Sequence, residues 1–320
     1  MGSLVKLSNF IGVDNGCDRI EGMIDEPIKT KTEMERSEWL PVSQQHRQAI
    51  VHWTEPFRQR RRIGKSHPVH DFLFVYYQYS PAKLEQWHPG VDVVLLDCSD
   101  DQFSQWPYHR QGRQTWCQPT EISEKELRRL QWIVQLLQNT SQAVGNYSCL
   151  GLHEWAMVYQ GTDVRHQQTT GLRLPQTEID ELVRSRPIRC SHFDAYRFFA
   201  EEARPLNRLS PTMESRLELE QPACIHANMD LYKWAFKSMP WVGSELLREC
   251  FDLAMQARQV DMRASPYDLT PLDGFEPIRI ETAAGRVEYE QAQRTIADAA
   301  KPIRERLIQR ISRVISLASS

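Results

Sequence analysis

The hydrophobic positions of this chain recur mostly at the spacing of α-helices. Trp53 and Phe57 lie on one such apolar face, which follows Ser43, a residue type that caps the starts of helices. Pro56 is expected to kink or end the regular part of this helix. Residues 1–40 lack this periodicity, and we predict that they form a loosely ordered lead-in.

Capping residues indicate where several further helices begin. Ser123 with Glu126 forms a capping-box pair ahead of an apolar helical face, and Ser191 with Asp194 forms a second pair. The second pair is expected to open a helix from His192 to Ala203. Three more helices are predicted over residues 222–237, 243–264 and 286–320, the last of them interrupted by Pro302.

A few short segments are richer in β-branched and aromatic residues. Val91–Leu96 is the best strand candidate, and residues 277–281 resemble a second strand. Phe72–Tyr79 fits either a helix that begins at Pro68 or a strand, and the pattern leaves both open. Residues 100–119, rich in Gln, Trp and Pro, are expected to form a long loop. The predicted fold is mainly α, a multi-helix globular domain with a few short strands.

Length and charge refine this prediction. A chain of 320 residues, 41% of them hydrophobic, can bury a sizeable core, so residues 41–320 are predicted to form a single mostly helical domain with a possible subdivision near residues 140–150. The net charge of -3 means that a nucleic-acid partner would need a local basic patch. The candidate patch consists of Arg58, Arg60, Arg61, Arg62 and Lys65, for which a solvated helix end is the alternative.

Cysteine usage and the lack of long apolar runs bear on location. The seven cysteines are scattered and never spaced C-x-x-C, which argues against a disulfide framework or a zinc ribbon and suits a reducing compartment. The first residues do not resemble a signal peptide, and no segment approaches the roughly 18 apolar residues that span a bilayer. We therefore expect a cytoplasmic protein without a membrane partner.

Histidines and carboxylates between residues 151 and 230 are candidates for a metal site. His226 and Asp230 lie four residues apart on one predicted helix, so both side chains project from the same face. A surface ion pair is the alternative for this pair, and a polar residue near a cap is the alternative for His192. Side chains from separate helices can converge on one divalent ion, iron or zinc, in a bundle core. The candidate ligands are His153, Glu154, His192, His226 and Asp230.

A second polar cluster closes the helix predicted over residues 243–264. Asp261, Arg263, Tyr267 and Asp268 fall within eight positions that end in a proline-containing turn. Arg263 could hold a phosphate or a carboxylate in a bidentate fork, or the cluster could simply tether a loop. The pattern favours neither explanation.

The segment before this helix resembles the hairpin of helix–hairpin–helix DNA glycosylases. Residues 239–247 contain a turn with proline and Gly243 that opens a helix, and such a turn presents backbone N–H groups to a DNA phosphate. In that superfamily an aspartate after a valine follows about one helix length later, as Asp261 does here. Aromatic side chains that could stack on an extruded base are Trp155, Trp234 and Trp241.

A longer resemblance covers roughly residues 40–300. The strings that carry it are HPVHDFLFVYY (67–77), WHPG (87–90), GLHEW (151–155), CSHFD (190–194), HANMDLYKW (226–234) and DMRASPYDL (261–269). In this order they resemble a bacterial family, common in actinobacteria, whose members usually carry the label 3-methyladenine DNA glycosylase. The resemblance implies an enzyme that extrudes an alkylated purine and hydrolyses its N-glycosidic bond without a cofactor. Asp261 would stabilise the oxocarbenium-like sugar or activate water, and aromatic rings would hold the cationic base.

Three functions therefore remain open. The first is DNA base excision, with Asp261 as the catalytic carboxylate and DNA held by the basic patch and the Gly243 turn. The alternative is a metal-dependent helical oxidoreductase or hydrolase that acts on a small molecule through the histidines. The third is a non-catalytic ligand-binding protein in which these polar residues form buried hydrogen-bond networks. Our prediction is the first.

Overall fold

The computed structural model describes residues 31–99, 101–119, 122–161, 171–272 and 274–319. Residues 31–320 form one compact unit, which is mostly helical (58%) with a small four-stranded mixed sheet. The predicted mainly α fold is thereby confirmed. Most of the predicted lead-in lies outside the described residues. Within the described part of the chain, no helix is both long enough and apolar enough to cross a membrane.

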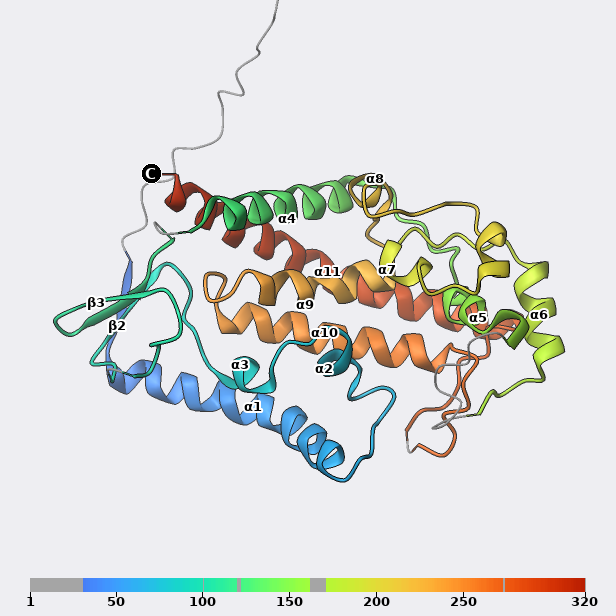
Figure 1. Cartoon of the computed structure of the whole chain (residues 1–320), viewed down its shortest axis with the longest axis horizontal. Coiled ribbons are helices and arrows are strands. Elements are labelled where there is room, and N and C mark those ends of the chain that lie inside the picture. The colour runs from blue at the N-terminus through green and yellow to red at the C-terminus, as the bar shows by residue number, and fades with distance from the viewer. Residues whose placement is uncertain (1–30, 100, 120–121, 162–170, 273, 320) are drawn as a thin grey trace, which may run out of the picture. The chain divides into compact units, whose positions relative to one another are not determined.

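Three long helices form the centre of this unit. They are α9 (Ile225–Lys237), α10 (Ser244–Arg263) and α11 (Ala283–Ala318), and each packs against the other two. Figure 1 shows them side by side, with α4 (Glu124–Gln142) along α11 and α1 (Arg36–Arg62) along the opposite side of α10. Their inward faces are apolar and build the larger of the hydrophobic cores.

The first helix begins earlier than the sequence pattern suggested. It begins at Arg36, not after Ser43, because Glu35 and Glu38 form the capping box: the Glu38 carboxylate accepts a hydrogen bond of 2.8 Å from the Glu35 backbone N–H. A short strand, β1 (Thr32–Met34), precedes it. The predicted boundary of the lead-in at residue 40 is therefore wrong at its C-terminal end.

Two prolines lie inside helices that the sequence predicted to break there. α1 continues past Pro56 to Arg62, and α11 continues past Pro302 to Ala318. A proline removes one backbone hydrogen bond, but buried side chains on both sides of it hold each helix to the core. These are Thr54 and Phe57 in α1, and Ala300 and Ile303 in α11.

The sheet corrects the prediction for residues 100–119. Its strand order is β1-β2-β4-β3, with β1 parallel to β2 (Val93–Leu96) and the other pairs antiparallel. The strand expected over Val91–Leu96 is confirmed as β2. The expected long loop instead contains the hairpin of β3 (Tyr108–Gln111) and β4 (Gln114–Cys117). Gly112 permits its tight turn, since its φ of +57° is a conformation that L side chains rarely adopt.

Shorter elements settle the remaining predictions. Phe72–Tyr76 is a helix, α2, and is followed by α3 (Pro81–Glu85). Ser123 caps α4 as expected, since its Oγ accepts a hydrogen bond of 3.2 Å from the backbone N–H of Glu126. Residues 277–281 form no strand, and the chain there instead makes turns that lead into α11.

The helix expected over residues 192–203 is largely absent. Only α7 (Phe193–Tyr196) and a separate 3-10 helix, η3 (Glu201–Leu206), form there. His192 is the N-cap residue of α7, and no side chain caps this helix, so the predicted Ser191–Asp194 capping box is wrong. The Asp194 carboxylate accepts a hydrogen bond of 2.7 Å from Lys233, far along the chain, and a tertiary ion pair thus replaces the local cap.

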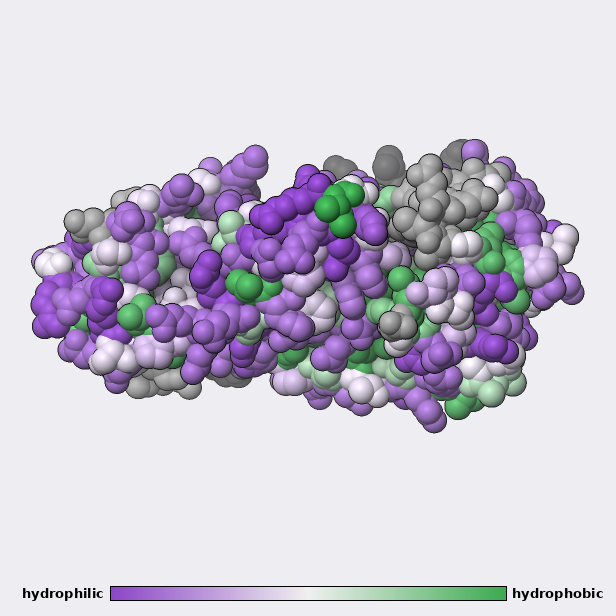
Figure 2. Space-filling view, turned by 90° about the horizontal axis from the view of Figure 1, so that it is seen from below, coloured by the Kyte–Doolittle hydropathy of each residue, from purple (hydrophilic) through white to green (hydrophobic). Residues whose placement is uncertain are grey.

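A second, smaller core forms where α5 (Leu152–Met157), α6 (Gln176–Ser185) and α7 pack around the end of α10 and the beginning of α11. These elements lie together at one end of the helical bundle in Figure 1. The candidate site lies where the two cores meet. On the face of the molecule that Figure 2 shows, hydrophobic residues form small separate patches among hydrophilic ones.

Candidate metal centre

The site is built by three helix termini. α5 contributes His153 and Glu154, the first turn of α9 contributes His226, and the last turn of α10 contributes Asp261. Gly151, the N-cap residue of α5, allows the close approach of these elements. Its φ is +75°, and a Cβ atom there would lie 3.3 Å from the side chains of Ala264 and Tyr289.

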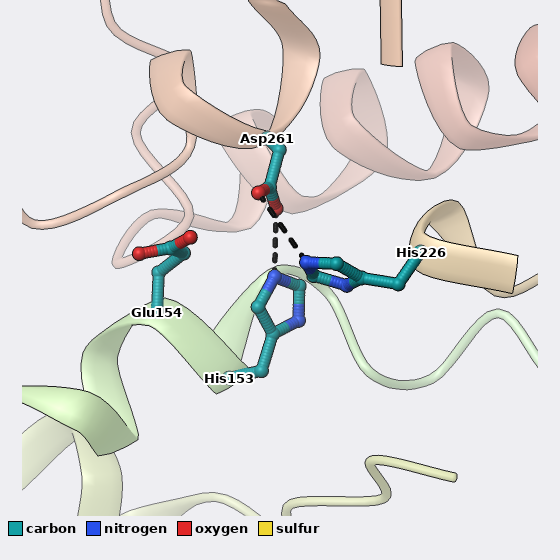
Figure 3. Close-up of side chains that lie close together, drawn as sticks. All are labelled: His153, Glu154, His226 and Asp261. Atoms are coloured by element: carbon teal, nitrogen blue, oxygen red, sulfur yellow. Dashed lines mark hydrogen bonds and ion pairs between the residues drawn. The ribbon is translucent and has the colours of Figure 1, made fainter. Parts of the chain in front are cut away.

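Ligand atoms from four side chains converge. One atom each from His153, Glu154, His226 and Asp261 lies within 4.8 Å of the other three. His153 Nε2 is hydrogen-bonded to Asp261 Oδ1 at 2.6 Å, and His226 Nε2 lies 3.7 Å from Asp261 Oδ2 (Figure 3). The two imidazole rings are nearly perpendicular, with centroids 4.5 Å apart. Two imidazoles and two carboxylates at this separation are a plausible ligand set for one divalent ion.

Arg258 completes the cluster, and the sequence analysis missed it. Its Nη1 donates hydrogen bonds of 3.1 Å to both Glu154 Oε1 and Asp261 Oδ2. Arg258 precedes Asp261 by three residues on α10, a spacing that places both on one face and that could have identified it. On its outer side the guanidinium lies 3.9 Å from the ring centroid of Phe72.

Burial and neighbouring charges separate the two histidines electrostatically. Burial lowers the pKa of His153, but the Asp261 carboxylate outweighs this effect, and the pKa lies well above its usual value. Burial lowers the pKa of His226 to about 3, so its imidazole is neutral at pH 7. Burial raises the pKa of Asp261, but His153 and His226 outweigh it and hold that pKa well below the ordinary range. His226 thus offers a free lone pair, and His153 and Asp261 form an ion pair.

His153 has a partner on its other ring nitrogen as well. Cys149 Sγ lies 3.3 Å from His153 Nδ1. A histidine that binds a metal through one nitrogen usually has a hydrogen-bond partner at the other, which fixes the orientation of the ring. Cys149 would serve as this partner at Nδ1 if Nε2, which contacts Asp261, bound the metal.

Two other predicted ligands belong to a neighbouring network. His192 stacks on His226 with ring centroids 5.5 Å apart, so the three histidines do converge. Asp230 is occupied elsewhere, because its carboxylate accepts hydrogen bonds from Tyr77 Oη (2.8 Å), Arg216 Nη2 (3.0 Å) and Lys233 Nζ (3.0 Å). The group of mutually close ligand atoms therefore includes Asp261 and not Asp230.

This second network concentrates charge in the interior. Arg216 Nε donates a hydrogen bond of 2.6 Å to Glu220, and Arg216 Nη2 reaches Asp230. His192 Nε2 lies 3.3 Å from Asp230 Oδ2 and 3.7 Å from Glu220 Oε1. Arg216 and Glu220 are four residues apart, at the start of α8 (Arg216–Leu219) and at its C-cap, and their contact is local. His192 and Asp230 are farther away in the sequence and reach this pair through tertiary packing.

A pocket of about 470 Å³ opens onto both clusters. Its polar lining includes Glu154, His192, His226, Asp230 and Arg258, together with Gln78, Asp194 and Arg197. The rest of the wall consists mainly of aromatic and other apolar side chains from α2 and from the region of α7. These include Phe72, Val75, Tyr76, Met157, Phe198 and Tyr267. A largely apolar cavity with a few convergent polar groups is the usual form of a small-molecule site.

The residues predicted to act with Asp261 in base excision have other contacts or surroundings in the described part of the chain. Arg263 interacts with Glu288, its Nη2 lying 3.2 Å from the carboxylate. Asp268 Oδ1 accepts a hydrogen bond of 3.0 Å from the backbone N–H of Thr270 and stabilises a turn. Tyr267 is buried, and it lines the pocket described above.

The predicted base-stacking tryptophans are all largely buried. Trp155 is fully buried, and its Nε1 donates a hydrogen bond of 2.8 Å to the Ala264 carbonyl. Trp234 and Trp241 are 4% and 3% exposed. Gly243 packs against Pro89, whose carbonyl oxygen would lie 3.1 Å from an added Cβ atom. The turn that resembled a DNA-binding hairpin is therefore covered by residues 88–91, with which it also exchanges backbone hydrogen bonds.

Two members of the basic patch are engaged inside the protein. Arg58 Nη1 lies 2.5 Å from Glu85, and Arg60 Nε donates a hydrogen bond of 3.0 Å to Asp71. Arg61, Arg62 and Lys65 are exposed at the end of α1. The exposed positive charge of the patch is therefore smaller than the sequence suggested.

Comparisons of the chain with protein-family models, with curated proteins and with solved structures found no match. The resemblance to the family labelled 3-methyladenine DNA glycosylase thus stays a prediction.

Proposed function

We propose that this protein is a metal-dependent enzyme that acts on a small molecule bound in the aromatic pocket. One observation carries the proposal: His153, Glu154, His226 and Asp261 bring four ligand atoms within 4.8 Å of one another beside a pocket of about 470 Å³. His226 and Glu154 line both the cluster and the pocket, so a ligand in the pocket would meet the ion.

The donor set suits a first-row transition metal. Ligand atoms that lie about 2.0–2.2 Å from one ion are roughly 3–4 Å from each other, so the observed separations need only small adjustments. Imidazole and carboxylate ligands suit iron, manganese or zinc. His226 is already neutral, whereas His153 would release its proton when the ion binds.

The cluster and the pocket together support a reaction at the ion. A bound metal would supply Lewis-acid activation of a water or of a substrate oxygen, or redox chemistry if the metal is iron. Arg258 would keep one carboxylate oriented after the ion had bound, since it bridges Glu154 and Asp261. Phe72 and Tyr76 would position an apolar substrate group and exclude water. An oxidoreductase and a hydrolase both remain within this proposal.

Base excision is the less well supported proposal. Asp261 is fully buried and engaged with His153 and Arg258, so its carboxylate has no free face for a DNA sugar. A cytoplasmic location also stays a prediction, in keeping with the free thiols of the cysteines in the described residues.

Metal analysis tests the proposal directly. Purified protein is dialysed against Fe(II), Mn(II) or Zn(II) and then against buffer, and the retained metal is measured by mass spectrometry. We expect about one equivalent per chain for the wild type and less than about a tenth for His226→Asn. His52→Asn, which changes an exposed histidine of α1, is the matched control and should retain the metal. Failure of the wild type to retain any of the three metals would reject the metal-dependent function.

A further inference from the structure

A second surface pocket adjoins the metal pocket. It has a volume of about 440 Å³, and Tyr76, Tyr77, Asp194 and Arg197 line both cavities. We call it the basic pocket, because five cationic side chains and one carboxylate, that of Asp194, line it. The cationic residues are Arg129, Arg197, Arg216, Lys233 and Lys237. The shared walls mean that one molecule could occupy both cavities.

The innermost cations of the basic pocket are already neutralised. Arg216 and Lys233 are bound to the buried carboxylate of Asp230, and Lys233 Nζ also lies 2.7 Å from Asp194. Glu220 accepts a further hydrogen bond from Arg216. These two cations therefore belong to the interior network and stabilise the wall of the pocket.

The outer cations are less fully neutralised by carboxylates. Arg197 Nε lies 3.4 Å from Asp194, whose carboxylate is shared with Lys233, and the Arg197 side chain is 45% exposed. Arg129 pairs with Glu126 at 3.0 Å and is 43% exposed. Exposed ion pairs of this kind contribute little and exchange readily with an incoming anion.

Lys237 is the unbalanced member of the group. No hydrogen bond or ion pair of its ammonium group is found among the described residues. Burial lowers its pKa, and the positive charges of Arg129 and Lys233 lower it further. An anion bound among the three cations would attract each of them and so offset this repulsion.

The walls between the two cavities are aromatic. Tyr76 stacks on Phe72 with ring centroids 5.0 Å apart, and it meets Phe198 edge-on at 6.3 Å. Trp132 and Phe236 continue the apolar wall in the basic pocket. A ligand that fits both cavities would therefore carry a planar apolar body and an anionic end.

We propose that the basic pocket binds the anionic group of the substrate, a small aromatic phosphate or carboxylate whose body extends past Tyr76 toward the metal centre. The assignment of this ligand as the substrate rests on the proposed metal-dependent function. The binding itself depends on Lys237, Arg129 and Arg197 and requires no metal, so the two proposals can fail separately.

The test measures binding to protein from which metal has been removed by a chelator. The probes are 1-naphthyl phosphate, 1-naphthoate and neutral 1-naphthol, titrated by calorimetry at low and high salt. We expect at least one anionic probe to bind saturably and at least about tenfold more tightly than 1-naphthol, with affinity falling as salt is raised. The two anionic probes distinguish a preference for phosphate from a preference for carboxylate.

Variants of Lys237 locate the site. Lys237 is exposed on its helix, so Lys237→Gln and Lys237→Glu should fold like the wild type. We expect about a tenfold loss of affinity for the anionic probe in the first and a greater loss in the second. Arg61→Gln, a change of an exposed arginine on α1, is the control and should bind as the wild type does. Equal affinity for 1-naphthol and the anionic probes, or unchanged binding in Lys237→Glu, would overturn the proposal.

Discussion

Replacing Asp261 with asparagine tests the charge pairing at the centre of the site. The substitution keeps the size of the side chain and removes its charge. Asp261 is fully buried, and it accepts hydrogen bonds from His153 Nε2 at 2.6 Å and from Arg258 Nη1 at 3.1 Å. In Asp261→Asn, His153 loses its counterion, and Arg258 keeps only its hydrogen bond to Glu154.

The contacts of Asp261 indicate how much the free energy of unfolding should fall. Removing one partner of a buried ion pair costs about 3–5 kcal/mol. Arg258 retains the hydrogen bond to Glu154, and His153 can release its proton, so we expect the lower end, about 3 kcal/mol. For a chain of 320 residues the entropy of unfolding is about 0.6–0.7 kcal/mol/K, so Tm should fall by about 5 °C.

The assay is urea and thermal unfolding of the metal-stripped protein between pH 6 and pH 9. The pKa of His153 is higher in the folded protein than in the unfolded chain. The resulting stabilisation is fully present at pH values below the unfolded-chain pKa, and it is lost as the pH rises through the folded-state pKa. The difference between the wild type and Asp261→Asn should therefore shrink at high pH. Asp252→Asn, at an exposed position of the same helix, should change stability by less than about 0.5 kcal/mol. If Asp261→Asn were as stable as the wild type at pH 6–7, the inferred ion pair would be refuted.

Three further changes follow from the structure. Gly285→Ala should destabilise the protein by about 2 kcal/mol or more in urea unfolding, because the added Cβ would overlap the Arg279 carbonyl group; an unchanged midpoint would contradict this. Arg216→Met should cost about 3 kcal/mol or more, because it removes the cation bound to Glu220 and one of the two cations bound to Asp230, whereas a conservative lysine should restore part of the loss. Burial lowers the pKa of His88 to about 3. Below about pH 6.5 this histidine is therefore protonated in the unfolded chain but not in the folded protein. The free energy of unfolding should fall by up to about 1.4 kcal/mol per pH unit as the pH is lowered from about 6.5 to about 3. His88→Gln should flatten this part of the stability profile, and an unaltered slope would show that His88 does not contribute.

Local signals predicted the helices well and the small sheet poorly. The helices α9 and α10 follow strong apolar periodicity, and they lie within a few residues of the predicted ranges. The hairpin of β3 and β4 was missed, because Gln and Trp obscure the alternation and the strands gain their stability from pairing with each other and, for β4, with β2. The helix predicted after His192 was lost because Asp194 pairs with Lys233 instead of capping it. Tertiary pairing decided both outcomes.

The candidate site shows the same limit. The sequence identified His153, Glu154 and His226 as metal ligands, and the structure brings these three together. It assigned Asp261 to a separate, sugar-binding role, since 107 residues separate Glu154 from Asp261 and no local pattern links them. Their contact depends on α5 docking at the end of α10, where the second core forms.

The charges of the two clusters show what binding of an ion would change. The second network contains three carboxylates (Asp194, Glu220 and Asp230) and three cations (Arg197, Arg216 and Lys233), so its charges balance when each carboxylate is ionised. In the metal-free cluster, Arg258 and protonated His153 balance two carboxylates. A divalent ion that displaced the proton of His153 would leave this cluster with one positive charge. An ion that binds the folded protein and not the unfolded chain stabilises the fold, so Tm should rise with metal concentration in the wild type and not in His226→Asn.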